Sequence, residues 1–153
     1  MHMSDLKILI FPDPKLRKVA KRIEKFDKSL EIFAQDMIQT MYEAEGIGLA
    51  ATQVDVHIRL VVMDLSEERN TPKIFVNPEY TILDKSPFTY EEGCLSIPGF
   101  NEEISRASKI LLKWQDLQGN CHQEQPEGIF TVCAQHEIDH LDGKLFVDYL
   151  SPI

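Results

Sequence analysis

Cysteine is scarce in this chain, which has only Cys94, Cys121 and Cys133 among 153 residues. The odd count and the lack of a signal peptide exclude a disulfide-bonded secreted domain and predict free thiols or thiolate ligands in the cytoplasm. No apolar run is long enough to span a bilayer, so we expect no membrane partner. Basic residues are also few: 16 Lys and Arg stand against 25 Asp and Glu, giving a formal net charge of −9. Phosphate binding needs clustered positive charge, so a nucleic-acid footprint is excluded as well.

The composition that remains is typical of a folded domain. Apolar residues make up 43% and charged residues 27% of the sequence, which suits a soluble globular protein with a substantial core. A length of 153 residues fits one domain, and no repeat or break in composition divides it. We therefore expect a single domain over residues 4–153, and we interpret Met1-His2-Met3 as a cloning remnant together with the native start Met.

Two kinds of periodicity predict the secondary structure of the first two thirds of the chain. Residues 28–45 carry apolar side chains at helical spacing behind Asp27, a suitable N-cap, so we expect a helix that ends at Gly46 and Gly48. Short apolar runs predict strands at 58–63, 73–76, 80–83 and 110–114, with Asn77-Pro78 separating the second from the third. These strands follow one another too closely for crossover helices, so their pairing should be mostly antiparallel.

A last helix is predicted from about Gly128 to Leu141, with Asp142-Gly143 as its stop. One face of this helix would carry an apolar stripe that leads into a pair of imidazoles, because these residues recur at helical spacing: Ile129, Val132, Cys133, His136 and His140. That face must be buried or line a cleft.

The segment His136-Glu137-Ile138-Asp139-His140 has the spacing of a metal site. Two histidines four positions apart on a helix point the same way, one turn apart, so both rings can reach one ion. Glu137 lies between them and can reach a water on the metal as a general base. The motif therefore predicts a metal-dependent hydrolase.

A catalytic metal of this kind needs three protein ligands, and the third is not downstream. The residues after His140 contain no further His, Glu or Cys, and Phe146 stands where one peptidase class carries its third histidine. Cys133 belongs to the apolar stripe of the predicted helix, so we interpret it as a packing residue rather than a ligand. Cys94 lies in a segment constrained by glycine and proline, which can fix the direction of its side chain. A thiolate beside two imidazoles would suit zinc or ferrous iron. The upstream candidates are Cys94, Cys121, Cys133, His57, His122 and the acidic residues.

Three segments carry a resemblance to a known family. They are Gly46-Ile47-Gly48-Leu49-Ala50-Ala51-Thr52-Gln53, Glu92-Gly93-Cys94-Leu95-Ser96 and Gln135-His136-Glu137-Ile138-Asp139-His140. In this order and spacing the chain resembles peptide deformylase, from about Ile8 to the C-terminus. Members of that family remove the N-terminal formyl group from formyl-Met of newly made polypeptides and release formate.

The resemblance implies an α+β fold, with antiparallel sheets around a central metal-binding helix. It implies that Cys94, His136 and His140 bind one divalent metal ion and that Glu137 is the general base. The family is similar in using Fe²⁺ natively, with Zn²⁺, Ni²⁺ or Co²⁺ able to occupy the site. The resemblance further implies that the oxyanion is held by the Gln53 side chain and the Leu95 backbone N–H. It also implies a pocket for the substrate methionine, lined by Ile47, Gly48, Tyr90, Ile129, Val132 and Cys133.

Two features depart from the family pattern. Asn101 occupies a position where relatives often carry an Arg that touches the substrate backbone, which leaves the peptide preference beyond formyl-Met open. The chain ends at Ile153, whereas many relatives continue into a helix that docks on the ribosome, so ribosome docking is not inferred. From the motif alone, two alternatives stay open: a general HExxH metallopeptidase and a catalytically silent metal-binding relative.

Overall fold

The computed structural model describes residues 5–150, and over this range it is an α+β fold with one antiparallel sheet. The sheet has five strands in the order β1-β2-β3-β4-β5, so each strand pairs with its neighbours in sequence. Residues 1–4 and 151–153, which include the predicted cloning remnant, lie outside the described range. The elements are η1 (Pro14–Arg17), α1 (Lys28–Glu43), β1 (Gly48–Ala50), η2 (Ala51–Val54), β2 (Leu60–Met63), β3 (Lys73–Cys94), β4 (Ile97–Gln115), β5 (Cys121–Glu124), α2 (Ile129–Leu141) and η3 (Phe146–Tyr149).

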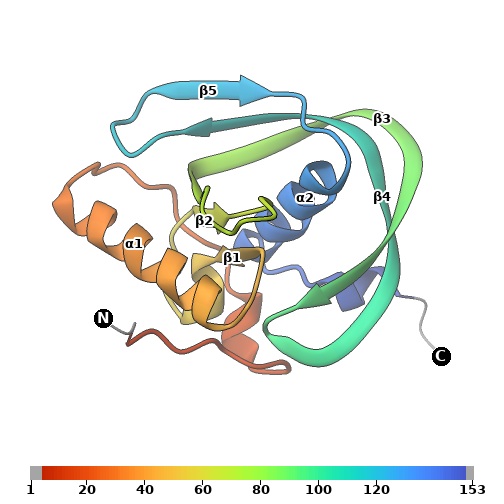
Figure 1. Cartoon of the computed structure of the whole chain (residues 1–153), viewed down its shortest axis with the longest axis horizontal. Helices are drawn as coiled ribbons and strands as arrows, with labels where there is room; N and C mark the ends of the chain where they lie inside the picture. The colour runs from red at the N-terminus through yellow and green to blue at the C-terminus, as the bar shows by residue number, and fades with distance from the viewer. Residues whose placement is uncertain (1–4, 151–153) are drawn as a thin grey trace.

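Strands β3 and β4 form a long, curved hairpin that bends around α2 (Figure 1). Their pairing runs from Val76↔Gln115 to Cys94↔Ile97, and it contains register shifts that bend and twist such a ribbon. The α2 helix packs against β4, β1 and β3. The hairpin therefore brings its closed end, with Cys94, back to the helix that carries the two motif histidines.

The first helix confirms the predicted N-cap and shifts the predicted end. The Asp27 carboxylate accepts a hydrogen bond from the Leu30 N–H at 3.1 Å, so α1 begins at Lys28 as expected. The helix ends at Glu43, because Glu45 adopts a left-handed backbone (φ 59°) and the Gly46 N–H donates back to the Met41 carbonyl. The chain thus leaves the helix before reaching the predicted glycine stop.

The predicted break at Asn77-Pro78 is wrong, because β3 runs without interruption from Lys73 to Cys94. Asn77 takes a positive φ of 49°, and the pairing with β4 shifts register between Val76 and Glu79. The Asn77 side chain also binds both the N–H and the carbonyl of Ile23. A bulge therefore absorbs the proline, which lacks an N–H for the ladder, and the strand continues.

The last helix lies where the sequence predicts it. It spans Ile129–Leu141 and has Asp142 as its C-cap. Gly143 adopts φ +76°, and a Cβ there would lie 2.4 Å from the Arg17 carbonyl oxygen, so only glycine fits this stop. Every residue from Thr131 to Leu141 is buried, including the polar ones. Polar side chains buried in this way need partners, and these are described below.

Two apolar cores lie on opposite faces of β2, because side chains alternate along a strand. Leu60 and Val62 pack into the cluster that includes the inner face of α1. Val61 and Met63 pack into the cluster that includes α2 and the inner face of the β3–β4 hairpin. This short, fully buried strand holds the two helices on either side of the sheet.

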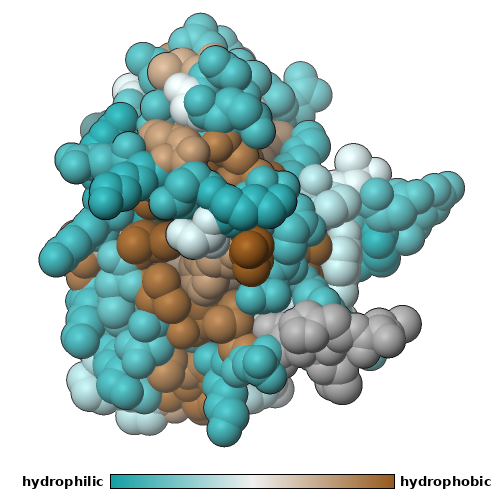
Figure 2. Space-filling view, turned by 90° about the vertical axis from the view of Figure 1, so that its left-hand side faces the viewer, coloured by the Kyte–Doolittle hydropathy of each residue, from teal (hydrophilic) through white to brown (hydrophobic). Residues whose placement is uncertain are grey.

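The face seen from the α1 side is hydrophilic at its edges and carries a band of apolar residues through its middle (Figure 2). Within residues 5–150, neither helix is long and apolar enough to cross a membrane.

Candidate metal centre

Three side chains from two distant parts of the chain converge beside α2. His136 and His140 come from consecutive turns of the helix, and their Nε2 atoms lie 3.2 Å apart. Cys94 comes from the end of β3, and its Sγ lies 3.4 Å from Nε2 of His140. Among residues 5–150, these three form the one group of His, Cys, Asp and Glu side chains whose donor atoms are close enough to share an ion.

The spacing and chemistry of this group fit a metal ion. Bonds of about 2.1 Å to nitrogen and 2.3 Å to sulfur place tetrahedral ligand atoms roughly 3.3 to 3.6 Å apart, close to the separations found here. Nδ1 of His136 lies 2.8 Å from a carboxylate oxygen of Glu92, so Nδ1 donates to this carboxylate and Nε2 is the ring atom that could bind a metal ion. The donor set of one sulfur and two nitrogens suits zinc or ferrous iron.

The charges around His136 favour a positive charge at this point. Burial alone would lower the pKa of His136, but the negative charge of Glu137 and hydrogen bonds with Cys94 and Glu92 raise it to about 10. A bound cation would interact favourably with the same acidic groups. Nδ1 of His140 is buried and has no hydrogen-bond partner among the described residues.

Glu137 lies beside the donor group, with its carboxylate against the backbone of β1. A Cβ on Gly48 would lie 2.5 Å from Oε2 of Glu137, so glycine makes room for the carboxylate. Glu137 is 5% exposed, and its Oε1 has no hydrogen-bond partner among residues 5–150. Burial raises the pKa of Glu137 to about 7. The carboxylate therefore lies beside the donor residues with one buried oxygen that has no protein partner within this range.

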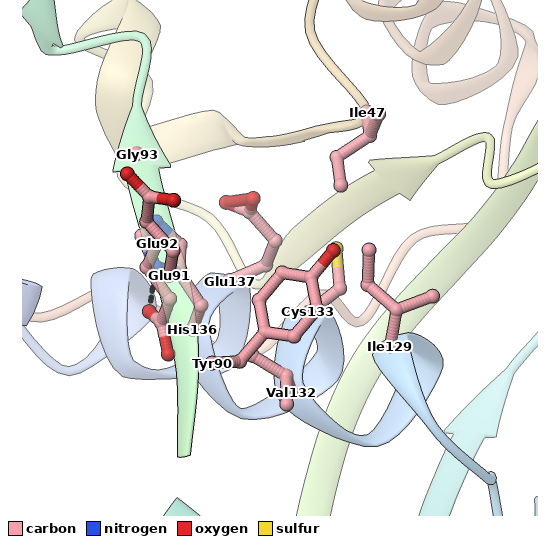
Figure 3. Close-up of a pocket in the computed structure, with 10 residues that line it drawn as sticks. All are labelled: Ile47, Tyr90, Glu91, Glu92, Gly93, Ile129, Val132, Cys133, His136 and Glu137. Carbon is pink, nitrogen blue, oxygen red and sulfur yellow. Dashed lines mark hydrogen bonds and ion pairs between the residues drawn. The ribbon is translucent and has the colours of Figure 1, made fainter. Parts of the chain in front are cut away.

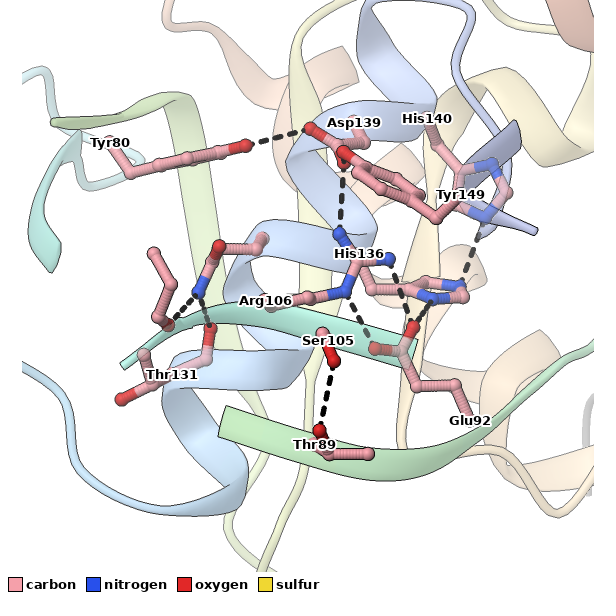
Figure 4. Close-up of polar contacts among 12 residues, drawn as sticks. Tyr80, Thr89, Glu92, Ser105, Arg106, Thr131, His136, Asp139, His140 and Tyr149 are labelled. Carbon is pink, nitrogen blue, oxygen red and sulfur yellow. Dashed lines mark hydrogen bonds and ion pairs between the residues drawn. The ribbon is translucent and has the colours of Figure 1, made fainter. Parts of the chain in front are cut away.

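A buried ionic network contacts the imidazole of His136 through its Nδ1 atom (Figure 4). Glu92 accepts two hydrogen bonds from Arg106, at 2.6 and 2.9 Å, as well as the one from His136. Arg106 also donates to Asp139 at 3.0 Å, and Asp139 accepts from the hydroxyl of Tyr149 at 2.6 Å. Although burial alone would raise the pKa of Glu92, the bonds from His136 and Arg106 hold it below its usual value. The network thus fixes the ring orientation of a donor residue.

Gln53 and Leu95 lie beside the donor group. Gln53 is buried; its amide oxygen accepts from the Ala50 N–H at 2.9 Å, and its amide nitrogen donates to Ser96 at 3.1 Å. The same nitrogen lies 3.6 Å from Sγ of Cys94. Leu95 follows Cys94 at the closed end of the hairpin and lines the adjoining cleft. The Gln53 amide is therefore oriented toward the donor group by its own bonds.

An apolar cavity of about 80 Å³ lies next to the donor group. Figure 3 shows Ile129, Cys133 and Glu137 reaching toward it from α2, with Tyr90 and Ile47 on neighbouring segments. Five of the six predicted methionine-pocket residues line it: Ile47, Tyr90, Ile129, Val132 and Cys133. The sixth, Gly48, lines the adjoining cleft instead.

The adjoining cleft, of about 440 Å³, is larger. It is bordered on one side by Glu45, Gly46, Ile47 and Gly48 and on the other by the closed end of the hairpin. His136 and Glu137 line both the cavity and the cleft. The donor group and the buried carboxylate therefore lie where the two spaces meet.

The remaining candidate ligands lie elsewhere. Cys121 and His122 are on the exposed strand β5, where His122 contacts Asp116 at 2.8 Å. His57 contacts Asp55 at 2.9 Å. Cys133 lines the cavity, and burial raises the pKa of its thiol. Phe146, at the place where one peptidase class has its third histidine, stacks its ring 6.0 Å from that of His136.

The roles of several residues of the site cannot be inferred from the sequence. Glu92 begins one of the three family segments, but neither its spacing nor its neighbour Glu91 indicates a bond to His136. Arg106 and Asp139 meet only because the hairpin bends back onto α2, at a separation of 33 positions. Asn101, the departure from the family pattern, lies opposite Gly93 on β4, and its Oδ1 would lie 2.4 Å from a Cβ there.

Comparisons with known proteins agree over almost the whole chain. Residues 5–153 match the family described as Polypeptide deformylase. The peptide deformylase of Pseudomonas aeruginosa is 54% identical over 151 residues, which cover 99% of this chain and 90% of that protein. The peptide deformylase of Hahella chejuensis is 52% identical over 151 residues, with the same coverage.

Solved structures agree with the fold. The peptide deformylase of Synechococcus elongatus in complex with actinonin has a TM-score of 0.93 at 36% identity, covering 99% of this chain and 83% of that one. The enzyme of Thermotoga maritima has a TM-score of 0.91 at 43% identity, covering 99% and 100%. The chain therefore belongs to the polypeptide deformylase family, the enzymes that remove N-terminal formyl groups from nascent polypeptides.

Proposed function

We propose that Cys94, His136 and His140 hold one divalent cation and that Glu137 is the general base of the deformylase reaction. The observation that carries this assignment is the convergence of the three donor atoms, within 4.8 Å of one another, beside a buried carboxylate. This convergence lies where the apolar cavity and the cleft meet. The α2 helix is then the central metal-binding helix of the fold.

The cation we propose is Fe²⁺ in the native enzyme, with Zn²⁺, Ni²⁺ or Co²⁺ able to replace it. The support is the donor set of one thiolate and two imidazoles, which these metals share. A divalent cation at this place would bring the pKa of a coordinated water toward neutrality and polarise the formyl carbonyl.

Glu137 is proposed to move the proton in both halves of the reaction. Its free Oε1 would take a proton from the attacking water and later deliver it to the amine that leaves when formate is released. Burial of Glu137 keeps bulk water from competing for this proton. Gly48 leaves the room that the carboxylate occupies, because a Cβ there would lie 2.5 Å from Oε2.

The oxygen of the formyl group gains negative charge as water attacks. We propose that the Gln53 amide nitrogen and the Leu95 backbone N–H hold this oxygen. Gln53 is suited to the task because its amide oxygen is fixed by the Ala50 N–H, which orients the amide nitrogen toward the donor group. Donors that are oriented before the reaction stabilise developing charge without a reorganisation cost.

The methionine side chain of the substrate is proposed to occupy the apolar cavity, whose wall includes Ile129, Val132 and Cys133 of α2. A narrow apolar slot suits an unbranched, polarizable side chain. The rest of the peptide would lie along the cleft beside Gly46-Ile47-Gly48, where glycine lets a backbone approach closely.

We propose that residues 4–153 form one catalytic domain that acts in the cytoplasm on N-formylated nascent chains. The packing of both helices against a single sheet over residues 5–150 supports this unit.

The test is formate release from a formyl-Met tripeptide, measured anaerobically with the metal content determined on the same sample. We expect turnover with about one divalent cation per chain, and no cleavage of the unformylated tripeptide. Cleavage of unformylated peptides would favour a general metallopeptidase. A bound cation without any formate release would favour a silent relative.

A further inference from the structure

A compact loop follows β2 and is organised around one buried carboxylate. Asp64, which is 1% exposed, accepts hydrogen bonds from the Ser66 N–H at 2.8 Å and the Thr71 N–H at 3.1 Å. The hydroxyl of Tyr42, from α1, donates to the same carboxylate at 2.5 Å. These bonds close residues 64–71 into a unit that is attached to α1.

Arg69 connects this loop to the segment Gly46-Ile47-Gly48, which we call the cleft wall. Its guanidinium donates to the Asp64 carbonyl at 2.8 Å and to the Gly46 carbonyl, and it lies 5.3 Å above the ring of Tyr42. Arg69 also has a left-handed backbone (φ 57°), which a residue with a long side chain adopts rarely. The side-chain contacts compensate for that conformation.

A second bond holds the next residue of the cleft wall to the same loop. The Asp64 N–H donates to the Ile47 carbonyl at 2.9 Å, beside the bond from Arg69 to Gly46. The cleft wall has little side-chain packing of its own, because two of its three residues are glycines and Ile47 is 41% exposed. Its path is therefore set by backbone bonds: these two, the bond from the Gly46 N–H to the Met41 carbonyl, and the pairing of Gly48 with Met63.

The cleft wall borders the spaces that we assign to the substrate. Ile47 lines both the apolar cavity and the cleft, and Gly46 and Gly48 line the cleft. The metal donors and Glu137 are carried by β3 and α2, not by this segment. Gly48 lies beside the Glu137 carboxylate, but the two bonds from the loop reach Gly46 and Ile47. Loss of these bonds should therefore act mainly on peptide binding.

We propose that Arg69 is a positioning residue for peptide binding, which fixes the cleft wall by joining the Gly46 carbonyl to the loop after β2. The inference rests on the proposed function, in which the peptide lies along this segment. Arg69 touches neither the proposed donor residues nor Glu137 among its contacts above, so its loss should raise KM and largely spare kcat.

The experiment compares Arg69→Ala, Arg69→Lys and the control Arg17→Ala on formyl-Met tripeptides. Arg17 is a matched control because its guanidinium also joins a backbone carbonyl, that of Gly143, to a second segment through Asp148. For Arg69→Ala we expect KM to rise roughly 5- to 30-fold, with kcat within about threefold of wild type and the metal content unchanged. Arg69→Lys should recover part of the loss, since one ammonium cannot reproduce the two-pronged geometry. Arg17→Ala should leave KM unchanged.

Amide hydrogen exchange provides a readout that does not depend on activity. The Asp64 amide, bonded to Ile47, should exchange at least about tenfold faster in Arg69→Ala than in wild type, and not in Arg17→Ala. An unchanged KM in Arg69→Ala, or unchanged exchange at Asp64, overturns the inference while wild-type turnover stands. Wild-type protein that binds metal but releases no formate fails the proposed function instead, and this is seen before any variant is compared.

Discussion

Two clusters built from arginine, carboxylate and tyrosine lie beside the cleft that we propose holds the peptide. In the first, Arg106 is 2% exposed, pairs with Glu92 and Asp139, and lies 4.8 Å above the ring of Tyr149. In the second, Arg69 is half-buried and donates to two backbone carbonyls rather than to a carboxylate. The parts are alike, but their burial and their partners differ.

The difference matches what each side has to hold. A buried ion pair costs a large desolvation energy, so it is stable only when every partner is in place, and it then permits few alternative arrangements. That rigidity suits the side that orients His136. Bonds from a half-buried guanidinium to neutral carbonyl oxygens involve no buried ion pair, so their loss should cost less stability while still releasing the cleft wall.

The largest effect is expected where the two sides touch, at Glu137. Glu137→Gln keeps the shape and the contact with Gly48 but cannot accept a proton. We expect kcat to fall by roughly 10²- to 10⁴-fold, with the metal content unchanged, as measured by formate release and metal analysis on one sample. The exposed Glu127→Gln serves as a control and should keep wild-type kcat. Near-normal kcat in metal-loaded Glu137→Gln would remove Glu137 from the role of base.

Truncating each arginine tests whether the two clusters differ in their contribution to stability. Arg106→Ala leaves Glu92 and Asp139 buried without their cation, and we expect a loss of about 3–5 kcal/mol in the free energy of unfolding. Arg69→Ala should lose only about 1 kcal/mol. Urea denaturation of both variants measures the difference. Equal losses would mean that the two clusters contribute equally to stability, whatever their burial and partners.

A third test examines the apolar cavity, which is lined both by α2 and by Ile47 of the cleft wall. Val132→Phe should overpack it and lower kcat/KM for formyl-Met peptides by roughly 10- to 100-fold, with the metal retained. Val132→Ile is the matched smaller enlargement and should cost less. Metal loss in the Phe variant would indicate a disturbed helix instead. Equal kcat/KM of the wild type for formyl-Met and formyl-Gly peptides would refute the pocket assignment.

The smallest expected effect is on the free energy of unfolding, through the pH dependence of the contribution that Asp64 makes to it. Burial opposes ionisation of Asp64, but hydrogen bonds from Ser66 and Tyr42 lower its pKa to about 2, below the ordinary 3.8. Its stabilising contribution should be complete above pH 3.8 and should be lost as the pH falls through about 2. The difference in unfolding free energy between wild type and Asp64→Asn should therefore be on the order of 1–2 kcal/mol at pH 7 and should shrink toward pH 2. A difference that does not vary with pH would contradict this origin.

The parts of the fold that the sequence predicts are those that depend on local spacing. The apolar stripe of α2 and the glycine stop after it predict that helix within a residue, and Asp27 marks the start of α1. The failure at Asn77-Pro78 has a non-local cause, because the side chain of Asn77 binds Ile23, which is 54 positions away. Propensity favours a break there, and tertiary hydrogen bonds stabilise a bulge instead.

In the site, too, the residues that can be predicted are those that depend on local spacing. Spacing alone identifies His136, Glu137 and His140, because they share a helix. The residues alone left the third ligand open, and Cys94 was inferred from the resemblance to a family. Arg106 could not be found from sequence, because the need for a buried cation arises only after Glu92 and Asp139 have been brought together.

The separation of the proposed ligands along the chain has a consequence for folding. Cys94 and His140 are 46 positions apart, so in an unfolded chain the two histidines lie far along the chain from the proposed thiolate ligand. The full donor set exists only after the β3–β4 hairpin has closed and docked on α2. A cation then acts as a crosslink between segments whose joining has already cost chain entropy, and it stabilises the native state by mass action. The temperature at which the chain unfolds should therefore depend on the free metal concentration, and cooperativity between hairpin and helix becomes a property of the bound ion as well as of the sequence.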